Sequence, residues 1–266
     1  MKNHQPPLPA DSVRSADRPH SPKLAVASIG HWLDYGWRTF CAAWPISMLF
    51  ATLFAAIGLV GIFLFLHLGL VPLIYPWAGG FMLIGPALLC GYFQAARRLA
   101  AGERPGWADL MTGFRSSPPA VWVMGVLSAF LLMIWLTDAA IIYGLYFGRE
   151  PVFLHWDLLS RPEMREDLWT YFVFCTLVGS VVALILFATS AFSVPLMFFQ
   201  RTPLATAVTR SVRLVFANLR VMVLWGLLLT VAIVGAIILF MPLFVVLFPL
   251  LAYASEAAYR EACETG

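Results

Sequence analysis

Long runs of apolar residues, broken only by short polar connections, dominate the chain. Four of them are clear: residues 45–70, 72–96, 119–147 and about 168–199. Each exceeds the roughly 20 residues that an α-helix needs to cross about 30 Å of hydrocarbon. The pattern therefore predicts four membrane-spanning helices.

A fifth run, Leu219 to Ala254, is too long for one span and short for two. A single helix of this length would measure roughly 54 Å. Pro242 offers a break, because proline cannot continue the intrahelical hydrogen-bond ladder, and the break gives spans 219–240 and 242–258. One long helix stays open as the alternative. With the hairpin, residues 29–262 form an all-α membrane bundle, six transmembrane helices arranged as three helical hairpins.

Composition agrees with lipid as the surrounding solvent. Apolar residues make up 61% of the chain and charged residues 12%, against roughly 45–50% and about 25% in soluble domains. Residues 1–28 are instead rich in proline and polar residues and lack the apolar run that a signal peptide contains. We expect them to form a disordered cytoplasmic tail.

Lysine and arginine predict the orientation, because they concentrate in cytoplasmic segments. Arg149, Arg161 and Arg165 lie in the connection between the third and fourth spans, whereas the others of the 17 basic residues lie at or beyond the opposite ends of the spans. The protein is therefore expected in a bacterial inner membrane with both termini in the cytoplasm.

Three segments before odd-numbered spans share a pattern of a small residue, an apolar residue and arginine. They are Gly36-Trp37-Arg38, Gly113-Phe114-Arg115 and Ser211-Val212-Arg213. Apolar residues around them recur with helical spacing, for example Trp107, Leu110, Met111 and Phe114, which is typical of amphipathic helices in the headgroup plane. We interpret the chain as three copies of interfacial helix, span and span, with a chance likeness among apolar helices as the alternative.

Several stretches resemble the family called Domain of Unknown Function 2189, multi-pass bacterial membrane proteins without an established activity. The resemblance lies in Trp77 to Pro86, Gly91-Tyr-Phe, Arg97-Arg98, Thr176 to Gly179, Phe192 to Leu196 and Ala258-Tyr-Arg260. Gln200-Arg201 stands where the family usually has aspartate and arginine. The resemblance implies a membrane topology and no reaction mechanism.

Candidate chemistry is sparse. The five histidines are too few for the six membrane ligands of a haem-copper oxidase. No two of the four cysteines form a CxxC pair, and no nucleotide-binding or hydrolase motif is present. We expect no catalytic, metal or cofactor site and no nucleic-acid partner.

Asp138 is the candidate intramembrane polar site, since it is a carboxylate deep within the third apolar run. Such a charge costs at least about 2.5–3.5 kcal/mol in the bilayer centre, so it should face the bundle. It is either a proton or cation relay or a hydrogen-bond partner of neighbouring hydroxyls, for instance in the span that holds Thr189 and Ser190.

Small residues mark two further features. Ala140, Gly144 and Gly148 form a stripe that lets another helix approach closely, within the protein or in a homodimer. Gly79, Gly80, Gly85 and Pro86 predict a kink in the second span, either an ordinary bend or a discontinuous helix around a substrate.

These features favour a non-enzymatic membrane component that interacts with lipids, other membrane proteins or itself. A small-solute or ion permease that uses Asp138 is the alternative. The substrate, partner and oligomeric state do not follow from the sequence.

Overall fold

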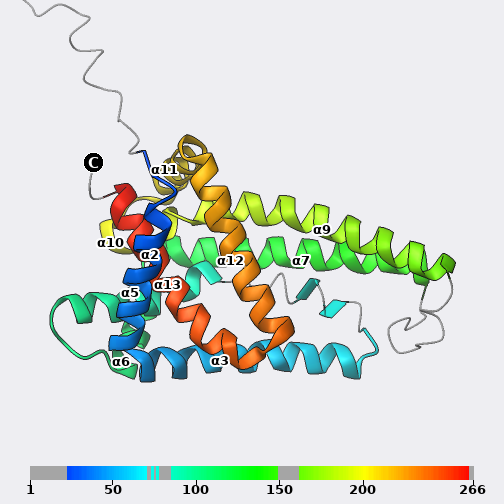
Figure 1. Cartoon of the computed structure of the whole chain (residues 1–266), viewed down its shortest axis with the longest axis horizontal. Coiled ribbons are helices and arrows are strands. Elements are labelled where there is room, and N and C mark those ends of the chain that lie inside the picture. The colour runs from blue at the N-terminus through cyan, green and yellow to red at the C-terminus, as the bar shows by residue number, and fades with distance from the viewer. Residues whose placement is uncertain (1–22, 71–72, 75, 78–84, 149–161, 264–266) are drawn as a thin grey trace, which may run out of the picture.

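The computed structural model describes residues 23–70, 73–74, 76–77, 85–148 and 162–263. Within these residues the regular structure is helical and no strand occurs, so the predicted all-α fold is confirmed (Figure 1). The apolar composition of the runs favours helices whose backbone groups are satisfied internally, as lipid requires.

Five segments of the described chain are long and apolar enough to cross a membrane. They are carried by α3 (Trp44–His67), α7 (Pro119–Phe147), α9 (Pro162–Ser190) with its continuation, α12 (Leu219–Leu239) and α13 (Met241–Cys263). The expected span at 72–96 lies partly outside the described residues, and its second half is α5 (Gly85–Ala100). The predicted number of six spans is therefore not confirmed.

The run from Leu219 onward consists of two helices, with the break at Phe240. Pro242 lies in the first turn of α13, where its missing N–H costs no hydrogen bond. Figure 1 shows α12 descending to this break and α13 returning from it. One long helix is thereby ruled out.

The fourth predicted span, 168–199, differs from the prediction in having a break. α9 ends at Ser190 and α10 (Ser193–Gln200) follows. Pro195 accounts for the break, because it cannot donate to the carbonyl of Ala191 and its ring crowds that turn. The amide of Phe192 is instead bound by the hydroxyl of Ser211, at 3.1 Å.

All three expected interfacial segments are helices that precede a long one. α2 (Ser28–Ala42) leads into α3, α6 (Trp107–Arg115) into α7, and α11 (Leu204–Ala217) into α12. The chain is already packed against the bundle before α2 begins, since Leu24 and Ser28 are buried. The amide of Leu24 donates to Oδ1 of Asn218 at 2.8 Å, which fixes the chain before α2 begins.

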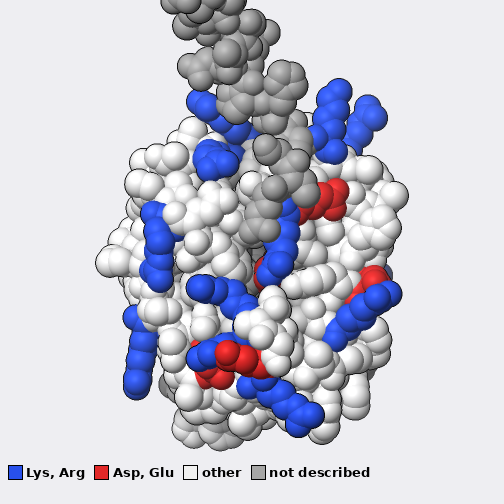
Figure 2. All heavy atoms as spheres, turned by 90° about the vertical axis from the view of Figure 1, so that its left-hand side faces the viewer, with Lys and Arg blue, Asp and Glu red and all other residues white. Residues whose placement is uncertain are grey.

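The short helices and the basic residues gather at one end of the bundle. Figure 1 shows α2, α5, α6, α10 and α11 on the left, whereas α7 and α9 run side by side to the far right. Figure 2 shows this end of the molecule face on, with Lys and Arg side chains distributed over it and around its edge. We call this the basic end. α13 is the central helix, with half of its most apolar window buried against 22–28% in the other candidate spans.

Candidate functional site at the basic end

Each interfacial helix places its small residue directly against the backbone of another helix. A Cβ added to Gly36 of α2 would lie 2.6 Å from the carbonyl oxygen of Leu250 in α13. A Cβ on Gly113 of α6 would lie 2.5 Å from the carbonyl oxygen of Cys90 in α5. These approaches are closer than any side chain allows, so each position requires glycine.

Ser211 of α11 makes the third contact through its hydroxyl. Its Oγ donates to the carbonyl of Ala188 in α9 at 2.8 Å and accepts from the amide of Phe192 at 3.1 Å. The small-apolar-arginine pattern thus marks three equivalent contacts, which we call the three locks: Gly36, Gly113 and Ser211.

The three locks connect the three copies of interfacial helix, span and span in a cycle. α6 of the second copy packs on α5 of the first, and α11 of the third copy packs on α9 and α10 of the second. α2 of the first copy packs on α13 of the third. The amino- and carboxyl-terminal parts of the protein thereby close one ring at the basic end.

Trp37 of α2 and Trp107 of α6 lie outside the close contacts that the small residues of these helices make. Trp37 and Trp107 are 51% and 42% exposed, whereas Gly36, Gly113 and Ser211 are buried. Close helix packing requires small residues, so the protein contact uses these positions and the tryptophans lie on the outer flank.

A charged pair lies at the end of α13. The carboxylate of Glu256 is fully buried, and its Oε1 accepts from Nε and Nη2 of Arg260 at 3.0 and 2.5 Å. The guanidinium of Arg260 stands over the ring of Tyr35 in α2, 5.8 Å from its centroid. A buried carboxylate needs such a partner, because an uncompensated charge there is strongly unfavourable.

Further hydrogen bonds join α13 to α2. The Glu261 carboxylate accepts from the hydroxyl of Ser28 at 2.5 Å and from the indole Nε1 of Trp32 at 2.7 Å. About two turns earlier in α13, the hydroxyl of Tyr253 lies 2.8 Å from that of Ser47 in α3. The terminal helix is therefore fixed by packing, charge and hydrogen bonds together.

The neighbouring connection between α5 and α6 is held by Arg98. Its guanidinium pairs with Glu103 and, at 2.8 Å, with Asp109 of α6. The hydrogen bond that Arg98 donates to Glu103 and the negative charges of Asp109 and Glu103 raise the pKa of Arg98. Its charge is permanent and serves to bind α6 to α5.

Sequence reasoning missed Glu256. It lies inside the predicted span 242–258, so Asp138 is not the only carboxylate in an apolar run. The signal was present in the spacing, since Glu256 precedes Arg260 by one helical turn.

Asp138 is half-buried on α7 and forms no hydrogen bond or ion pair with a described residue. α7 and α9 are antiparallel, as shown by Trp135 against Gly179 and by the rings of Tyr143 and Tyr171, 5.7 Å apart. This register sets Asp138 level with Thr176, whose hydroxyl donates to the carbonyl of Phe172.

The span that holds Thr189 and Ser190 does lie beside α7, but these two residues are not level with Asp138. In the observed register Thr189 lies about 20 Å further along the helix axis. The Thr189 hydroxyl donates to the carbonyls of Ile185 and Leu186 in its own helix.

The stripe of Ala140, Gly144 and Gly148 faces outward. All three residues are exposed, and no described atom lies within 4 Å of a Cβ added to Gly144 or Gly148. The described part of the protein thus offers the stripe no internal partner, and contact with a second molecule stays a prediction.

The predicted kink falls largely outside the described residues. Gly79 and Gly80 are among those not described, and Gly85 and Pro86 form the first turn of α5. Before them, the Trp77 indole donates to the carbonyl of Gly58 at 3.1 Å and covers Gly61 of α3.

Two kinds of ion pair occur among the described residues at the basic end. Arg98–Asp109 joins α5 to α6, whereas Asp34–Arg38 and Glu256–Arg260 each lie within one helix. Among the described residues, no three His, Cys, Asp or Glu side chains converge as metal ligands.

Comparison with known proteins agrees with the membrane fold. Residues 74–199 match the sequence model of the family described as "Predicted integral membrane protein (DUF2189)", so the resemblance to this family is confirmed over that segment. No curated protein and no solved structure matches the chain.

Proposed function

Since residues 74–199 match a family of predicted integral membrane proteins, we propose that this protein is a non-enzymatic component of a bacterial inner membrane. In this proposal the α7–α9 hairpin presents an apolar surface to other membrane proteins. The basic end lies in the cytoplasm, together with both termini.

The exposed surface of the α7–α9 hairpin carries this proposal. The two helices run together beyond the rest of the bundle (Figure 1), and only 28% and 22% of their most apolar windows are buried. Leu145, Trp169 and Leu177 are 79%, 71% and 64% exposed. Lipid tails or partner helices must cover this surface, because water cannot do so favourably.

The exposed small residues of α7 favour contact with a partner protein over contact with lipid alone. Helices in lipid associate by close packing at small residues, because lipid tails are as apolar as leucine. Ala140 and Gly144 lie on the exposed side of α7, where a partner helix could approach the backbone.

The orientation is supported by the placement of the basic residues. Lys and Arg side chains gather at the end that holds the interfacial helices (Figure 2), and such residues favour the cytoplasmic side. Arg165, in α9, is a described basic residue at the opposite end.

Photo-crosslinking in native membranes tests this function. A photoreactive residue at Leu145 should give a discrete adduct with a partner protein or a second copy, because this side chain is 79% exposed. The same residue at Met124, which is 2% exposed, is the matched control on α7 and should give crosslinks within the chain. Lipid adducts alone at Leu145 would contradict the proposal.

A second candidate is a permease that uses Asp138. Two observations favour it: Asp138 has no partner among the described residues, and nearby Nε1 of Trp135 is buried without a hydrogen bond to any of them. If the carboxylate carries a proton or cation, Asp138→Asn should abolish a flux in proteoliposomes while the protein stays folded. An unchanged flux removes this candidate.

A further inference from the structure

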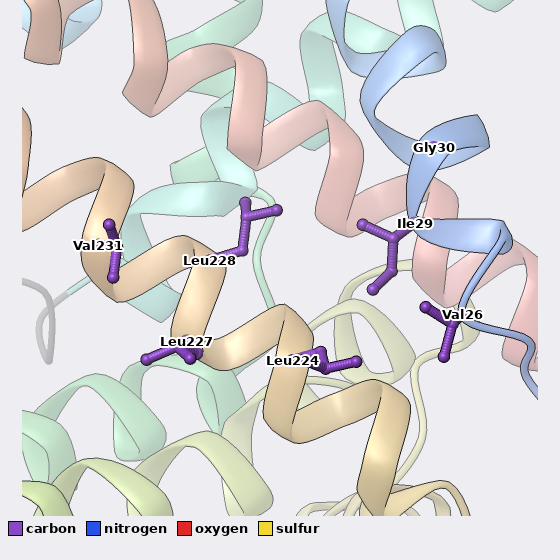
Figure 3. Close-up of a pocket in the computed structure, with 7 residues that line it drawn as sticks. All are labelled: Val26, Ile29, Gly30, Leu224, Leu227, Leu228 and Val231. Atoms are coloured by element: carbon purple, nitrogen blue, oxygen red, sulfur yellow. The ribbon is translucent and has the colours of Figure 1, made fainter.

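An apolar hollow of about 550 Å³ lies between the start of α2 and one face of α12. Val26, Ile29 and Gly30 line one side, and α12 lines the other from Leu224 to Val231. Figure 3 shows Ile29 and Leu228 reaching toward each other across the gap. The hollow is open to the outside, and a Cβ added to Gly30 would meet no described atom within 4 Å.

The shape of the hollow fits a lipid tail. Its α12 wall extends about 10 Å along the helix, within the roughly 15 Å of one leaflet's hydrocarbon. Val26, Leu227 and Val231 are 55%, 58% and 63% exposed. Water in the hollow would find few hydrogen-bond partners on these apolar walls, whereas an acyl chain covers them without losing hydrogen bonds.

Two basic residues precede the walls of the hollow along the chain: Lys23 lies three positions before Val26, and Arg220 lies four positions before Leu224. The bond from the Leu24 amide to Asn218, the N-cap residue of α12, brings Lys23 to the same end as Arg220. Both basic residues are exposed, and neither forms an ion pair with a described residue. The first turn of α12 contains no acidic residue, and its helix dipole favours an anion at this end.

A described acidic residue that faces the start of α2 is engaged in other hydrogen bonds. Glu261 faces α2 from α13 and accepts hydrogen bonds from Ser28 and Trp32. It therefore leaves Lys23 and Arg220 available to a ligand.

We propose that this hollow binds one acyl chain of an anionic phospholipid from the leaflet at the basic end. The phosphate is bound by Lys23 and Arg220, and the tail lies between α2 and α12. This proposal goes beyond the proposed function and does not depend on it, because lipid binding requires no protein partner.

The test is retention of lipid by the purified full-length protein, measured by native mass spectrometry in matched detergent. The probes are phosphatidylglycerol and phosphatidylcholine. We expect phosphatidylglycerol to be retained preferentially. The double variant Lys23→Gln/Arg220→Gln should lower its retention by about tenfold, since each basic residue near an anionic headgroup contributes several-fold. The control Arg210→Gln/Arg213→Gln removes two exposed charges from α11 and should have little effect.

Filling the hollow provides a second, independent variant. Gly30→Leu places a side chain in open space, so the fold should persist while lipid retention falls. Gly144→Leu is the matched control, because that position is also open. Equal retention of both lipids, or unchanged retention in both site variants, overturns the proposal. Lipid binding that appears only after removal of residues 1–22 also overturns it, because the tail would then be the occupant.

Discussion

At the scale of the residue, the close contacts of the three locks depend on side-chain size. Gly36 and Gly113 approach carbonyl oxygens of neighbouring helices, and backbone atoms cannot move aside as a flexible side chain can. The restriction is therefore steric at two locks and a matter of hydrogen bonding at Ser211.

Gly36→Ala tests the steric restriction. The added methyl group would lie 2.6 Å from the Leu250 carbonyl, so α2 must shift away from α13. We expect a loss of about 1–3 kcal/mol, as for other overpacked positions, measured by denaturant titration of the purified protein in detergent. Gly30→Ala on the same helix meets open space and should leave stability unchanged or slightly raised. Equal effects of the two variants would contradict the lock.

Ser211→Ala tests the hydrogen-bonded lock. The variant leaves the amide of Phe192 buried without its observed partner. We expect about 1–3 kcal/mol of destabilisation in the same titration. Thr209→Ala is the control, because the exposed Thr209 hydroxyl donates only within its own helix. A Ser211→Ala protein as stable as this control would show that the bond contributes nothing.

At the scale of the element, α13 is held in place by contacts with α2, a helix that lies far from it in the sequence. The two i,i+4 ion pairs of the α2–α13 region differ in environment. Asp34–Arg38 has side chains 56% and 78% exposed, whereas Glu256–Arg260 has a fully buried carboxylate. Burial, rather than spacing, should decide how much each pair contributes.

Arg260→Ala should therefore destabilise the protein by about 3 kcal/mol, because it strands a buried carboxylate. Arg38→Ala, at the exposed pair, should change the unfolding free energy little. Adding Glu256→Gln to Arg260→Ala removes the stranded charge and should restore part of the loss. Additive effects in this double-mutant cycle would show that the two side chains are not coupled.

The same distinction explains what the sequence could predict. Apolar runs predicted α3, α7, α12 and α13, because length and composition alone determine whether a helix can cross lipid. The break before α10 could have been predicted from Pro195, whereas the hydrogen bond to the Phe192 amide depends on Ser211 of another helix. The position of Arg260 over Tyr35 likewise depends on tertiary packing. The small-apolar-arginine pattern marked the positions of the three interfacial helices, whereas the close contact of each small residue with another helix was not predicted.

Asp138 shows the same limit in the candidate site. Its depth in α7 follows from sequence, but its neighbours depend on the register of α7 against α9. That register is fixed by pairs such as Tyr143 and Tyr171, which no helical periodicity reveals. Thr189, a hydroxyl residue of the span suggested as the partner of Asp138, consequently lies about 20 Å away along the axis.

At the scale of the whole molecule, the three locks and the basic residues occupy one end, while the α7–α9 hairpin reaches the other (Figure 1). The contacts between helices at the basic end can hold the protein together in the headgroup region. The long apolar helices α7 and α9 then stay accessible to neighbours in the membrane. The arrangement requires a defined orientation, because arginine favours the cytoplasmic leaflet.

Cysteine accessibility tests that orientation in cells expressing the full-length chain. Arg104→Cys lies in the exposed connection between α5 and α6, and Glu166→Cys lies near the exposed start of α9. Cys41 and Cys263 are replaced by serine to lower the background, whereas Cys90 and Cys175 are buried and remain. A membrane-impermeant maleimide should label Glu166→Cys in intact cells and Arg104→Cys only after permeabilisation. Labelling of Arg104→Cys from outside would reverse the topology, and it would also place the anionic-lipid hollow in the opposite leaflet.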